Sequence, residues 1–376
     1  MSEKKVNTDI LIPSELLPKD GRFGSGPSKV RREAVEALLA RSGDFLGTSH
    51  RQKTVKSVVG ELRRGLSDLF ILPDGYEVVL GNGGSTYFWD TAVFSLIERK
   101  SQHLSFGEFS AKFAASAKAA PFIEDPMIIK SEPGTHPEAV ADSSIDLYGL
   151  THNETSTGVA MTINRPIGAK GLVAVDATSG AAGLAVDPLE FDCYYFAPQK
   201  AFASDGGLWF ALMSPAAVER VGEIKASGRY IPPALDLSIA IDNSRLDQTY
   251  NTPALATIFL MNNQVQWMLA NGGIDFTTKR CATSSATLYS WAEASSYATP
   301  FVQDEEMRSK VVVTIDLDDA IDATVVASTL RKNGVVDTEP YRKLGRNQLR
   351  VAVFPAVEPA DVEALVACID YVVENL

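Results

Sequence analysis

A lysine and an aspartate, each at the end of an apolar stretch, are the residues of this sequence best suited to chemistry. Lys200 ends "YYFAPQK", and Asp176 ends "LVAVD", 24 residues earlier. A desolvated lysine has a lowered pKa and becomes a nucleophile near neutral pH. A buried aspartate needs a cationic partner. Each residue alone also fits a structural role, because a lysine at a strand end can reach water and an aspartate can cap a helix.

A glycine-rich turn, "GNGGSTYFWD" at residues 81–90, supplies a third feature. It joins an expected strand to an expected helix, and the N–H groups of a helix N-terminus bind phosphate. The turn has no GK[ST] sequence and matches G-x-G-x-x-G poorly, so alone it is equally an ordinary strand-to-helix turn. A pyridoxal-phosphate site needs a phosphate cup, an acid for the ring nitrogen and a lysine that forms a Schiff base. The turn, Asp176 and Lys200 together supply all three.

The elements that would position these residues alternate between strands and helices. Apolar strands are expected within "IDLYGLTHNETSTGV", "GLVAVDATSG" and "FDCYYFAPQK", whose polar ends are Thr155, Asp176 and Lys200. Helices are expected at residues 29–42 and 53–70 from their apolar spacing. The pattern predicts an α/β domain with a largely parallel sheet, and ligands bind such sheets outside the carboxyl ends of the strands.

The pattern of the chain changes after about residue 270. Strands are expected at residues 310–317 and 348–355, and helices at residues 322–335 and 359–376. We therefore predict three parts, which are an N-terminal arm belonging to the small domain (1–27), a large cofactor-binding domain (28–270) and a small C-terminal α+β domain (271–376).

Composition excludes several classes of protein. The 376 residues carry a formal net charge of −12, which argues against non-specific nucleic-acid binding. No apolar run is long enough for a signal-peptide core or a membrane helix. Three widely spaced cysteines and four histidines give neither a C-x-x-C nor an H-x-x-x-H motif, so no metal site is expected. We expect a cytoplasmic protein, because sparse cysteines fit a reducing compartment.

Seven short motifs make the chain resemble the phosphoserine aminotransferases, which are fold-type I, class V pyridoxal-phosphate enzymes. The motifs are "FGSGPSK", "GTSHRQK", "GNGGST", "THNETSTG", "VAVDATSG", "FAPQKAF" and "YNTPAL", and the resemblance spans residues 23–355. It implies that Lys200 is the Schiff-base lysine and that Asp176 binds the pyridine nitrogen. The remaining cofactor contacts that it implies are Gly84, Ser85, Thr86 and Gln199 at the phosphate, Thr155 at the ring hydroxyl, and Phe109 stacked on the ring where the family has a tryptophan.

The resemblance also implies how substrates are bound. His50 and Arg51 in "SHRQK" would meet the substrate anion, and Arg350 in "NQLRVAV" would bind the α-carboxylate. A C-terminal His-Arg element of the family that helps to bind substrate phosphate has no match, and Arg346 is the candidate to replace it. Without the family, a solvated basic turn explains His50 and Arg51 equally well, and a solvent-facing strand position explains Arg350.

The motif "YNTPAL" carries an expectation about assembly. By resemblance, Asn251 and Thr252 would reach the cofactor phosphate of a second subunit, so that a homodimer shares its active sites. Local signals predict in addition that Thr252 is a helix N-cap and that Pro253 is the first helical residue.

The implied activity is amino transfer between glutamate and a phosphorylated 2-oxo acid, 3-phosphonooxypyruvate, in serine biosynthesis. Use of an intermediate of pyridoxine (vitamin B6) biosynthesis is left open. One alternative is another class V aminotransferase, of the serine or alanine–glyoxylate type. A cysteine desulfurase would need a reactive cysteine, for which only Cys281 is loosely placed. A third alternative is a non-catalytic module that binds pyridoxal phosphate.

Overall fold

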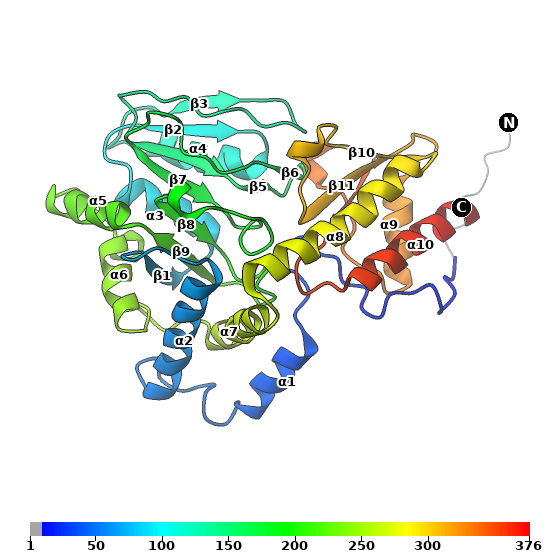
Figure 1. The fold of residues 1–376 in the computed structure, drawn as a ribbon, viewed down its shortest axis with the longest axis horizontal. Coiled ribbons are helices and arrows are strands. Elements are labelled where there is room, and N and C mark those ends of the chain that lie inside the picture. Colours follow the sequence, from blue (N-terminus) through cyan, green and yellow to red (C-terminus); the bar gives the residue numbers. More distant parts are fainter. Residues whose placement is uncertain (1–9) are drawn as a thin grey trace.

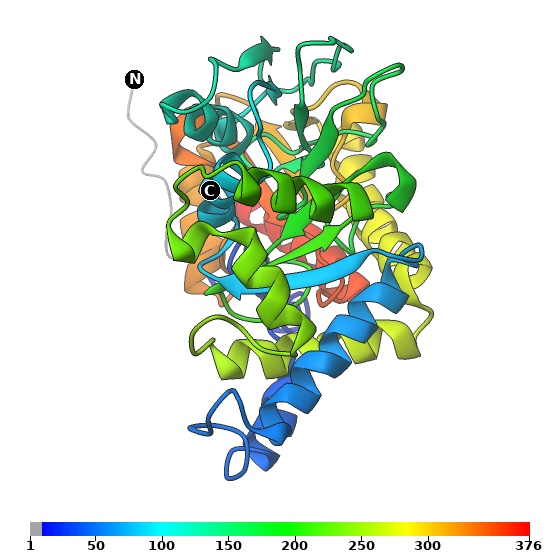
Figure 2. The same cartoon turned by 90° about the vertical axis from the view of Figure 1, so that its left-hand side faces the viewer.

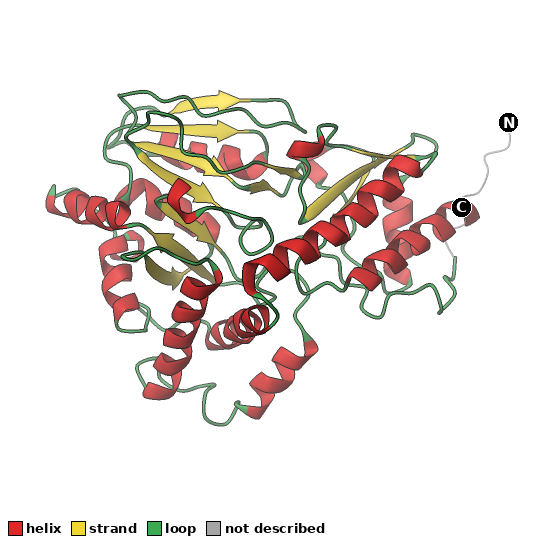
Figure 3. Ribbon diagram, in the orientation of Figure 1, coloured by secondary structure: helices red, strands yellow, loops and turns green. Residues whose placement is uncertain are grey.

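The computed structural model describes residues 10–376, which form a large α/β layer structure and a smaller sheet with its own helices (Figures 1 and 3). Residues 1–9 of the predicted arm lie outside the described residues. The helices are α1 (Arg32–Ala40), α2 (Lys53–Leu69), α3 (Ser85–Ser95), α4 (Glu108–Ala119), α5 (Pro215–Ala226), α6 (Leu237–Arg245), α7 (Leu255–Ala270), α8 (Gly273–Ala294), α9 (Ala323–Lys332) and α10 (Pro359–Asn375). The strands are β1 (Glu77–Asn82), β2 (Ser101–Ser105), β3 (Met127–Lys130), β4 (Leu147–Thr151), β5 (Asn153–Glu154), β6 (Val159–Ala160), β7 (Leu172–Asp176), β8 (Cys193–Phe196), β9 (Leu208–Met213), β10 (Ala298–Pro300), β11 (Val312–Leu317) and β12 (Gln348–Ala352).

The larger sheet within residues 10–376 has the strand order β1-β9-β8-β7-β4-β2-β3. Neighbouring strands from β8 to β3 are parallel, whereas β9 runs antiparallel to both β8 and β1. The carboxyl ends of β1, β4, β7 and β8 therefore share one edge of the sheet. The predicted, mostly parallel sheet is confirmed. The reversal of β9 is not visible in its apolar run "LWFALM", because either strand direction buries the same residues.

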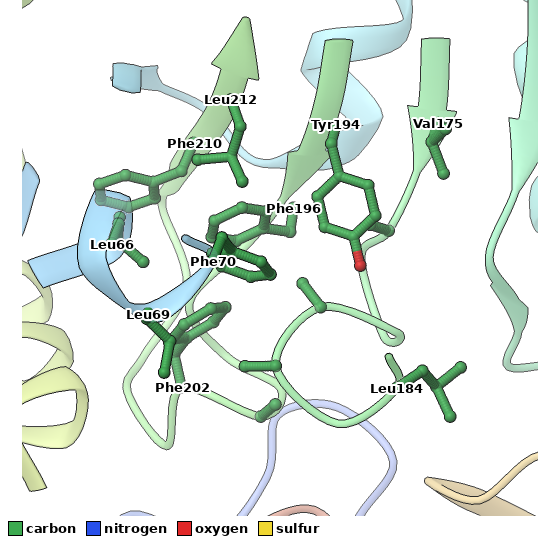
Figure 4. Packing of buried hydrophobic residues seen from close by; sticks show 14 of the residues in the cluster. Leu66, Leu69, Phe70, Val175, Leu184, Tyr194, Phe196, Phe202, Phe210 and Leu212 are labelled. Carbon is green, nitrogen blue, oxygen red and sulfur yellow. The ribbon is translucent and has the colours of Figure 1, made fainter. Parts of the chain in front are cut away.

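Alternate residues of the central strands pack against different helices. Tyr195 and Trp209 lie in a cluster with α3, α4, α5 and α6, and Figure 2 shows α5 and α6 in front of the sheet. Tyr194 and Phe196 lie in the opposite cluster with α2 and α7, and Figure 4 shows this packing around Leu66 of α2. The strands are buried on both faces, as is usual for parallel sheets. Residues at the carboxyl edge are thus held on a rigid support.

The smaller sheet, β10-β11-β12, is antiparallel and packs against α8, α9 and α10. Ile10, Ile12 and Phe23 of the N-terminal arm belong to the same apolar cluster. Helix α8 crosses from the larger core to the smaller one, since Cys281 packs in the first and Leu288 in the second (Figure 1). The domain limits stay a prediction, because one continuous helix serves both cores. None of the helices within residues 10–376 is long and apolar enough to cross a membrane.

Candidate active site

Lys200 lies in the turn between β8 and β9, and its side chain points into the protein. The ammonium nitrogen is 2.5 Å from the carbonyl oxygen of Ser25, to which it donates a hydrogen bond. Burial, together with the charge of Arg350, lowers the pKa of Lys200 from 10.5 to about 8, while Asp176 acts in the opposite direction. A lysine with this pKa has an appreciable neutral fraction at neutral pH and can act as a nucleophile.

The arm segment "GSGP" closes over Lys200. Ser28 donates hydrogen bonds from its hydroxyl to the carbonyl of Lys200, at 2.6 Å, and from its N–H to the carbonyl of Gln199, at 3.0 Å. A β-carbon added at Gly26 would lie 1.8 Å from Nζ of Lys200. Gly26 also has a φ of 143°, which other residues rarely adopt. The motif therefore needs glycine at this position, because any side chain would displace the lysine.

Asp176 is the last residue of β7, and both oxygens of its carboxylate accept hydrogen bonds. Thr178 donates to Oδ1 from its N–H, at 3.0 Å, and from its hydroxyl, at 2.5 Å. The indole Nε1 of Trp89 donates to Oδ2 at 2.8 Å. Burial raises the pKa of Asp176, and the donors on Thr178 and Trp89 oppose this shift because they favour the charged form. The site thus holds a buried acid that a cationic partner would stabilise.

The glycine-rich turn follows β1 and leads into α3. Gly83 and Gly84 have φ values of 128° and 125°, and Gly84 is the N-cap of α3 without a capping side chain. The hydroxyl of Ser85 and the side-chain carbonyl of Gln199 are buried without a hydrogen-bond partner in the described part of the chain. Thr86 is exposed beside Ser85. The helix N-terminus and these polar groups are suited to an anion.

Thr155, Phe109 and Arg350 come together with Tyr341 near the carboxyl end of β4. Nη1 of Arg350 donates to the carbonyl of Thr155 at 3.3 Å, and the Arg350 guanidinium lies 5.3 Å from the Tyr341 ring centroid. The ring centroids of Phe109 and Tyr341 are 6.1 Å apart. Nε of Arg350 is buried without a hydrogen-bond partner among residues 10–376. The hydroxyl of Thr155 donates to the hydroxyl of Ser179 at 2.6 Å.

Glu154, in "HNETS", connects the start of α4 to the segment that contains Thr155 through hydrogen bonds of its carboxylate. Its Oε2 accepts hydrogen bonds from the N–H groups of Phe109 and Ser110, at 3.1 and 2.9 Å, and from the Ser110 hydroxyl. Its Oε1 accepts from the N–H and the hydroxyl of Ser156. The carboxylate thus caps the N-terminus of α4, where helix N–H groups favour negative charge. One buried side chain therefore fixes the backbone at Phe109 and at Ser156, the residue that follows Thr155.

Asn251 and Thr252 lie against the end of β1, just before the glycine-rich turn. The side-chain amide of Asn82 contacts the side chain of Asn251 and donates to its carbonyl at 3.3 Å. The prediction that Thr252 caps a helix beginning at Pro253 is wrong, because α7 begins at Leu255 with Ala254 as its N-cap. The segment is instead a turn, in which the hydroxyl of Thr249 donates to the carbonyl of Asn251.

The structure does not bring the other predicted cations to Lys200. His50 and Arg51 lie in the connection between α1 and α2, at the lower edge of Figure 1. His50 is buried with Nε2 unpartnered among the described residues, and Arg51 is exposed. Arg346 forms a salt bridge with Asp316 and lies 4.6 Å from the ring centroid of Phe301. The guanidinium of Arg346 is therefore already paired with a carboxylate of β11.

Trp89, Tyr341 and Glu154 are functional candidates that the sequence reasoning missed. Trp89 could have been found, because it follows Ser85 by four residues and so lies on the same face of α3 as Ser85 in the glycine-rich turn. Tyr341 and Glu154 had weaker signals, since nothing local distinguishes them from other tyrosines and glutamates.

Comparison with known proteins identifies the family. Residues 24–338 match the family model described as aminotransferase class-V. The chain belongs to the aminotransferase class-V family. Within it, the chain is 62% identical over 367 residues to the phosphoserine aminotransferase of Rhodococcus jostii, covering 97% of this chain and 98% of that one. It is 60% identical over 373 residues to the phosphoserine aminotransferase of a Nocardioides species, covering 98% and 100%.

Solved structures agree with this class-V assignment at the level of the fold. The phosphoserine aminotransferase of Cytophaga hutchinsonii superposes with a TM-score of 0.85 at 24% identity, covering 93% of this chain and 99% of that one. The aspartate aminotransferase of Thermus thermophilus superposes with a TM-score of 0.79 at 21% identity, covering 94% and 99%. The predicted fold of the fold-type I enzymes is thereby confirmed.

Proposed function

We propose that this chain transfers the amino group of glutamate to 3-phosphonooxypyruvate, forming phosphoserine, with pyridoxal phosphate as cofactor. The observation that carries the proposal is the buried Lys200, whose Nζ lies against Ser25 and Gly26 and whose pKa responds to the charges of Arg350 and Asp176. A nucleophilic lysine, a buried acid and a carboxylate-binding arginine are the parts that amino transfer on this cofactor needs. Two relatives named phosphoserine aminotransferase, at 62% and 60% identity, support the choice of substrate.

The donor set fits the phosphate of this cofactor. The hydroxyl of Ser85 lacks a partner in the described residues, and the space around Gly84 is open, since an added β-carbon would meet nothing within 4 Å. The first N–H groups of α3 have no partner within the helix. Gly84, Ser85, Thr86 and Gln199 would therefore hold the phosphate.

The rest of the donor set fits the ring. Asp176 would pair with the ring nitrogen, and Thr155 would bind the ring hydroxyl. Phe109 would cover one face of the ring, as aromatic side chains do through offset stacking. Glu154 would fix the position of Phe109 relative to Thr155. Its carboxylate bonds to the N–H of Phe109, and Glu154 is the residue before Thr155 in the chain.

When bound, pyridoxal phosphate supplies an electron-accepting ring that stabilises negative charge at the α-carbon of the substrate. Lys200 would hold the cofactor covalently in the resting enzyme. Released by the substrate amine, Nζ of Lys200 would be the group that takes the proton from the substrate α-carbon and returns it, as a general base and then a general acid. Asp176 would keep the ring nitrogen protonated, and Arg350 would orient the α-carboxylate through its free Nε.

Two groups of cations are proposed for the remaining anion of the substrate. His50 and Arg51 would reach the site of a second subunit, because within one chain they lie away from Lys200. Arg342 is better placed than Arg346 to replace the missing His-Arg element. It follows Tyr341 and has no ion pair among residues 10–376, whereas Arg346 is paired with Asp316.

We further propose a cytoplasmic homodimer. The cysteines at 193, 281 and 368 are buried and free, which fits a reducing compartment. Val35, Leu39 and Leu46 are exposed apolar residues on α1 and the segment that follows it, and Tyr250 is exposed next to Asn251. Surfaces of this kind mark protein contacts, and a second copy would cover them.

Mixed dimers test whether the sites are shared. Lys200→Ala and the double variant Asn251→Ala, Thr252→Ala are each expected to be inactive. If Asn251 and Thr252 serve the partner, a mixed dimer has one site without either lesion. Random subunit exchange of equal amounts should then restore about a quarter of wild-type activity, because about half of the dimers are mixed and each has one intact site.

The matched control for this experiment carries all three substitutions in one chain. Mixed with Lys200→Ala, it can form no intact site and should restore nothing. Subunit exchange is verified by native mass spectrometry. No recovery in the first mixture, with exchange verified, would show that Asn251 acts only within its own chain, where it contacts Asn82.

The pKa of Lys200 predicts how cofactor capture depends on pH. Only the neutral amine attacks the cofactor aldehyde, so the capture rate of the apoprotein should rise with pH and level off above about 8. Arg350→Met removes a positive charge that disfavours the ammonium, so it should move the midpoint to higher pH. Arg346→Met is the control, because its charge is paired with Asp316. Stopped-flow absorbance between pH 6 and 10 measures the midpoint, and a wild-type value near 10.5 would contradict the buried lysine.

Substrate preference tests the function directly. With glutamate as the donor, kcat/KM is measured for 3-phosphonooxypyruvate, pyruvate and glyoxylate. The phosphorylated acid should be preferred by at least about 100-fold, because buried charge-assisted hydrogen bonds to phosphate are lost with the other two. A preference for glyoxylate or pyruvate would instead support a class V aminotransferase of the serine or alanine–glyoxylate type.

A further inference from the structure

We propose that Trp89 is a positioning residue, whose indole N–H holds Oδ2 of Asp176 so that the carboxylate presents one free acceptor position to the ring nitrogen of the cofactor. The proposal rests on the proposed function, which assigns Asp176 to that nitrogen. Trp89 and Asp176 are both buried, and their hydrogen bond is 2.8 Å long.

The hydrogen bonds of Asp176 leave little freedom for any other arrangement. A carboxylate has about four acceptor positions, two on each oxygen. Thr178 fills both positions on Oδ1 through its N–H and its hydroxyl. Trp89 fills one position on Oδ2. A single position on Oδ2 remains beside the indole, and its direction is fixed by Trp89 on Oδ2 acting together with Thr178 on Oδ1.

Helix α3 connects this contact to the phosphate cup. Ser85 and Trp89 are the first and fifth residues of α3, and both are buried. Residues four apart lie on the same face of a helix, with a rise between them of about 6 Å. One helix would thus bind the phosphate with its N-terminus and orient the acid at the ring nitrogen from its next turn. A shift of α3 would move both contacts together.

The surrounding side chains fix the indole and leave it as the donor. Phe88, next to Trp89, stacks on Tyr195 with ring centroids 4.4 Å apart. Tyr195 pairs with Asp176 in the register of β7 and β8, and its buried hydroxyl lies close enough to lower the pKa of that carboxyl. Nε1 of Trp89, at 2.8 Å, is nevertheless the one of these two neighbouring donors that makes a well-formed hydrogen bond to the carboxylate among residues 10–376.

Cofactor affinity of the apoprotein tests the proposal without measuring turnover. Trp89→Phe removes the N–H and keeps a buried ring. It should weaken pyridoxal-phosphate binding by about 10- to 100-fold, because a hydrogen bond to a buried charge is lost. The matched control is Trp209→Phe, which alters another buried indole packed on Phe88 but with Nε1 unpartnered. It should change affinity by less than about threefold, since no hydrogen bond is lost.

A double-mutant cycle distinguishes positioning from general packing. In the Asp176→Asn background, Trp89→Phe should have at most a small effect, because the charge that the indole orients is gone. Additive losses would overturn the proposal, as would equal losses in Trp89→Phe and Trp209→Phe. Failure of wild-type apoprotein to bind pyridoxal phosphate would instead overturn the proposed function, so the two failures are distinguishable.

Indole resonances provide a readout in the unaltered protein, should Trp89→Phe not fold. Wild-type protein labelled at its four tryptophans should show a shift of the Trp89 N–H signal on cofactor addition. Trp291 is the internal control, because its Nε1 donates to Asp370 at 2.8 Å, outside the site. Phenylalanine variants of the other three tryptophans assign the signals. An unchanged Trp89 signal in the holoprotein would overturn the proposal.

Discussion

Replacement of Lys200 by alanine is expected to lower kcat by at least about 10⁴-fold, because both covalent attachment and proton transfer at the α-carbon are lost. The neighbouring groups do not offer a substitute. Arg350 stays protonated in proteins, and Asp176 lies at the end of β7 with its oxygens engaged by Thr178 and Trp89. Turnover of glutamate with 3-phosphonooxypyruvate measures the effect.

Lys170→Ala is the control for this variant, since Lys170 is exposed on the connection that precedes β7. It should leave turnover unchanged. In the wild-type protein, borohydride reduction followed by peptide mapping should place the pyridoxyl group on Lys200. A label on any other lysine would remove Lys200 from the mechanism, whatever the activity of the alanine variant.

The meeting of the main site residues could be predicted from the sequence. Thr155, Asp176 and Lys200 follow apolar runs, and the carboxyl ends of parallel strands share one edge of a sheet. In the structure, Thr151 pairs with Asp176, and Asp176 pairs with Tyr195, so β4, β7 and β8 end side by side. The parallel direction of these strands follows from the alternation of strands and helices, and position along each strand follows from where the apolar run ends, whereas the order of the strands is not predicted.

The contacts that tune the site could not be predicted in this way. Trp89 and Asp176 are 87 residues apart, and Ser25 and Lys200 are 175 residues apart. Local patterns show which residues are buried. They do not show which buried polar groups meet, because that depends on side-chain rotamers and on the packing of a helix against the sheet.

Arg346 and Arg350 show that contacts of polar side chains are also hard to predict for residues close together in the sequence. Arg350 lies on β12, whereas Arg346 lies two residues before that strand begins. Arg350 lies opposite Thr314, with its Nε free and its Nη1 on the carbonyl of Thr155. Arg346 meets the carboxylate of Asp316, which neutralises it. The roles differ because the neighbouring strand β11 carries threonine at one position and aspartate at the other.

Asp176→Asn is expected to lower kcat by about 10²- to 10³-fold, the range found when one preorganised electrostatic contact to a transition state is removed. Asparagine keeps the shape of the side chain and can accept from Thr178, but it carries no charge to hold a proton on the ring nitrogen. Electron withdrawal from the α-carbon then weakens. The pKa of Lys200 should fall further, because the charge of Asp176 raises it, so the lysine stays nucleophilic and the borohydride label should still form at that residue.

Asp187→Asn is the matched control for this variant, because Asp187 is an exposed aspartate that caps a short helix and bonds to the N–H of Leu189. It should change kcat by less than about twofold, as surface substitutions usually do. If Asp176→Asn retained near-wild-type turnover, the hydrogen bonds from Thr178 would be the whole role of Asp176, which would then be a turn-forming residue. The hydrogen bond from the buried indole supports a role of Asp176 beyond turn formation. The turn needs only Oδ1, whereas Trp89 bonds to Oδ2.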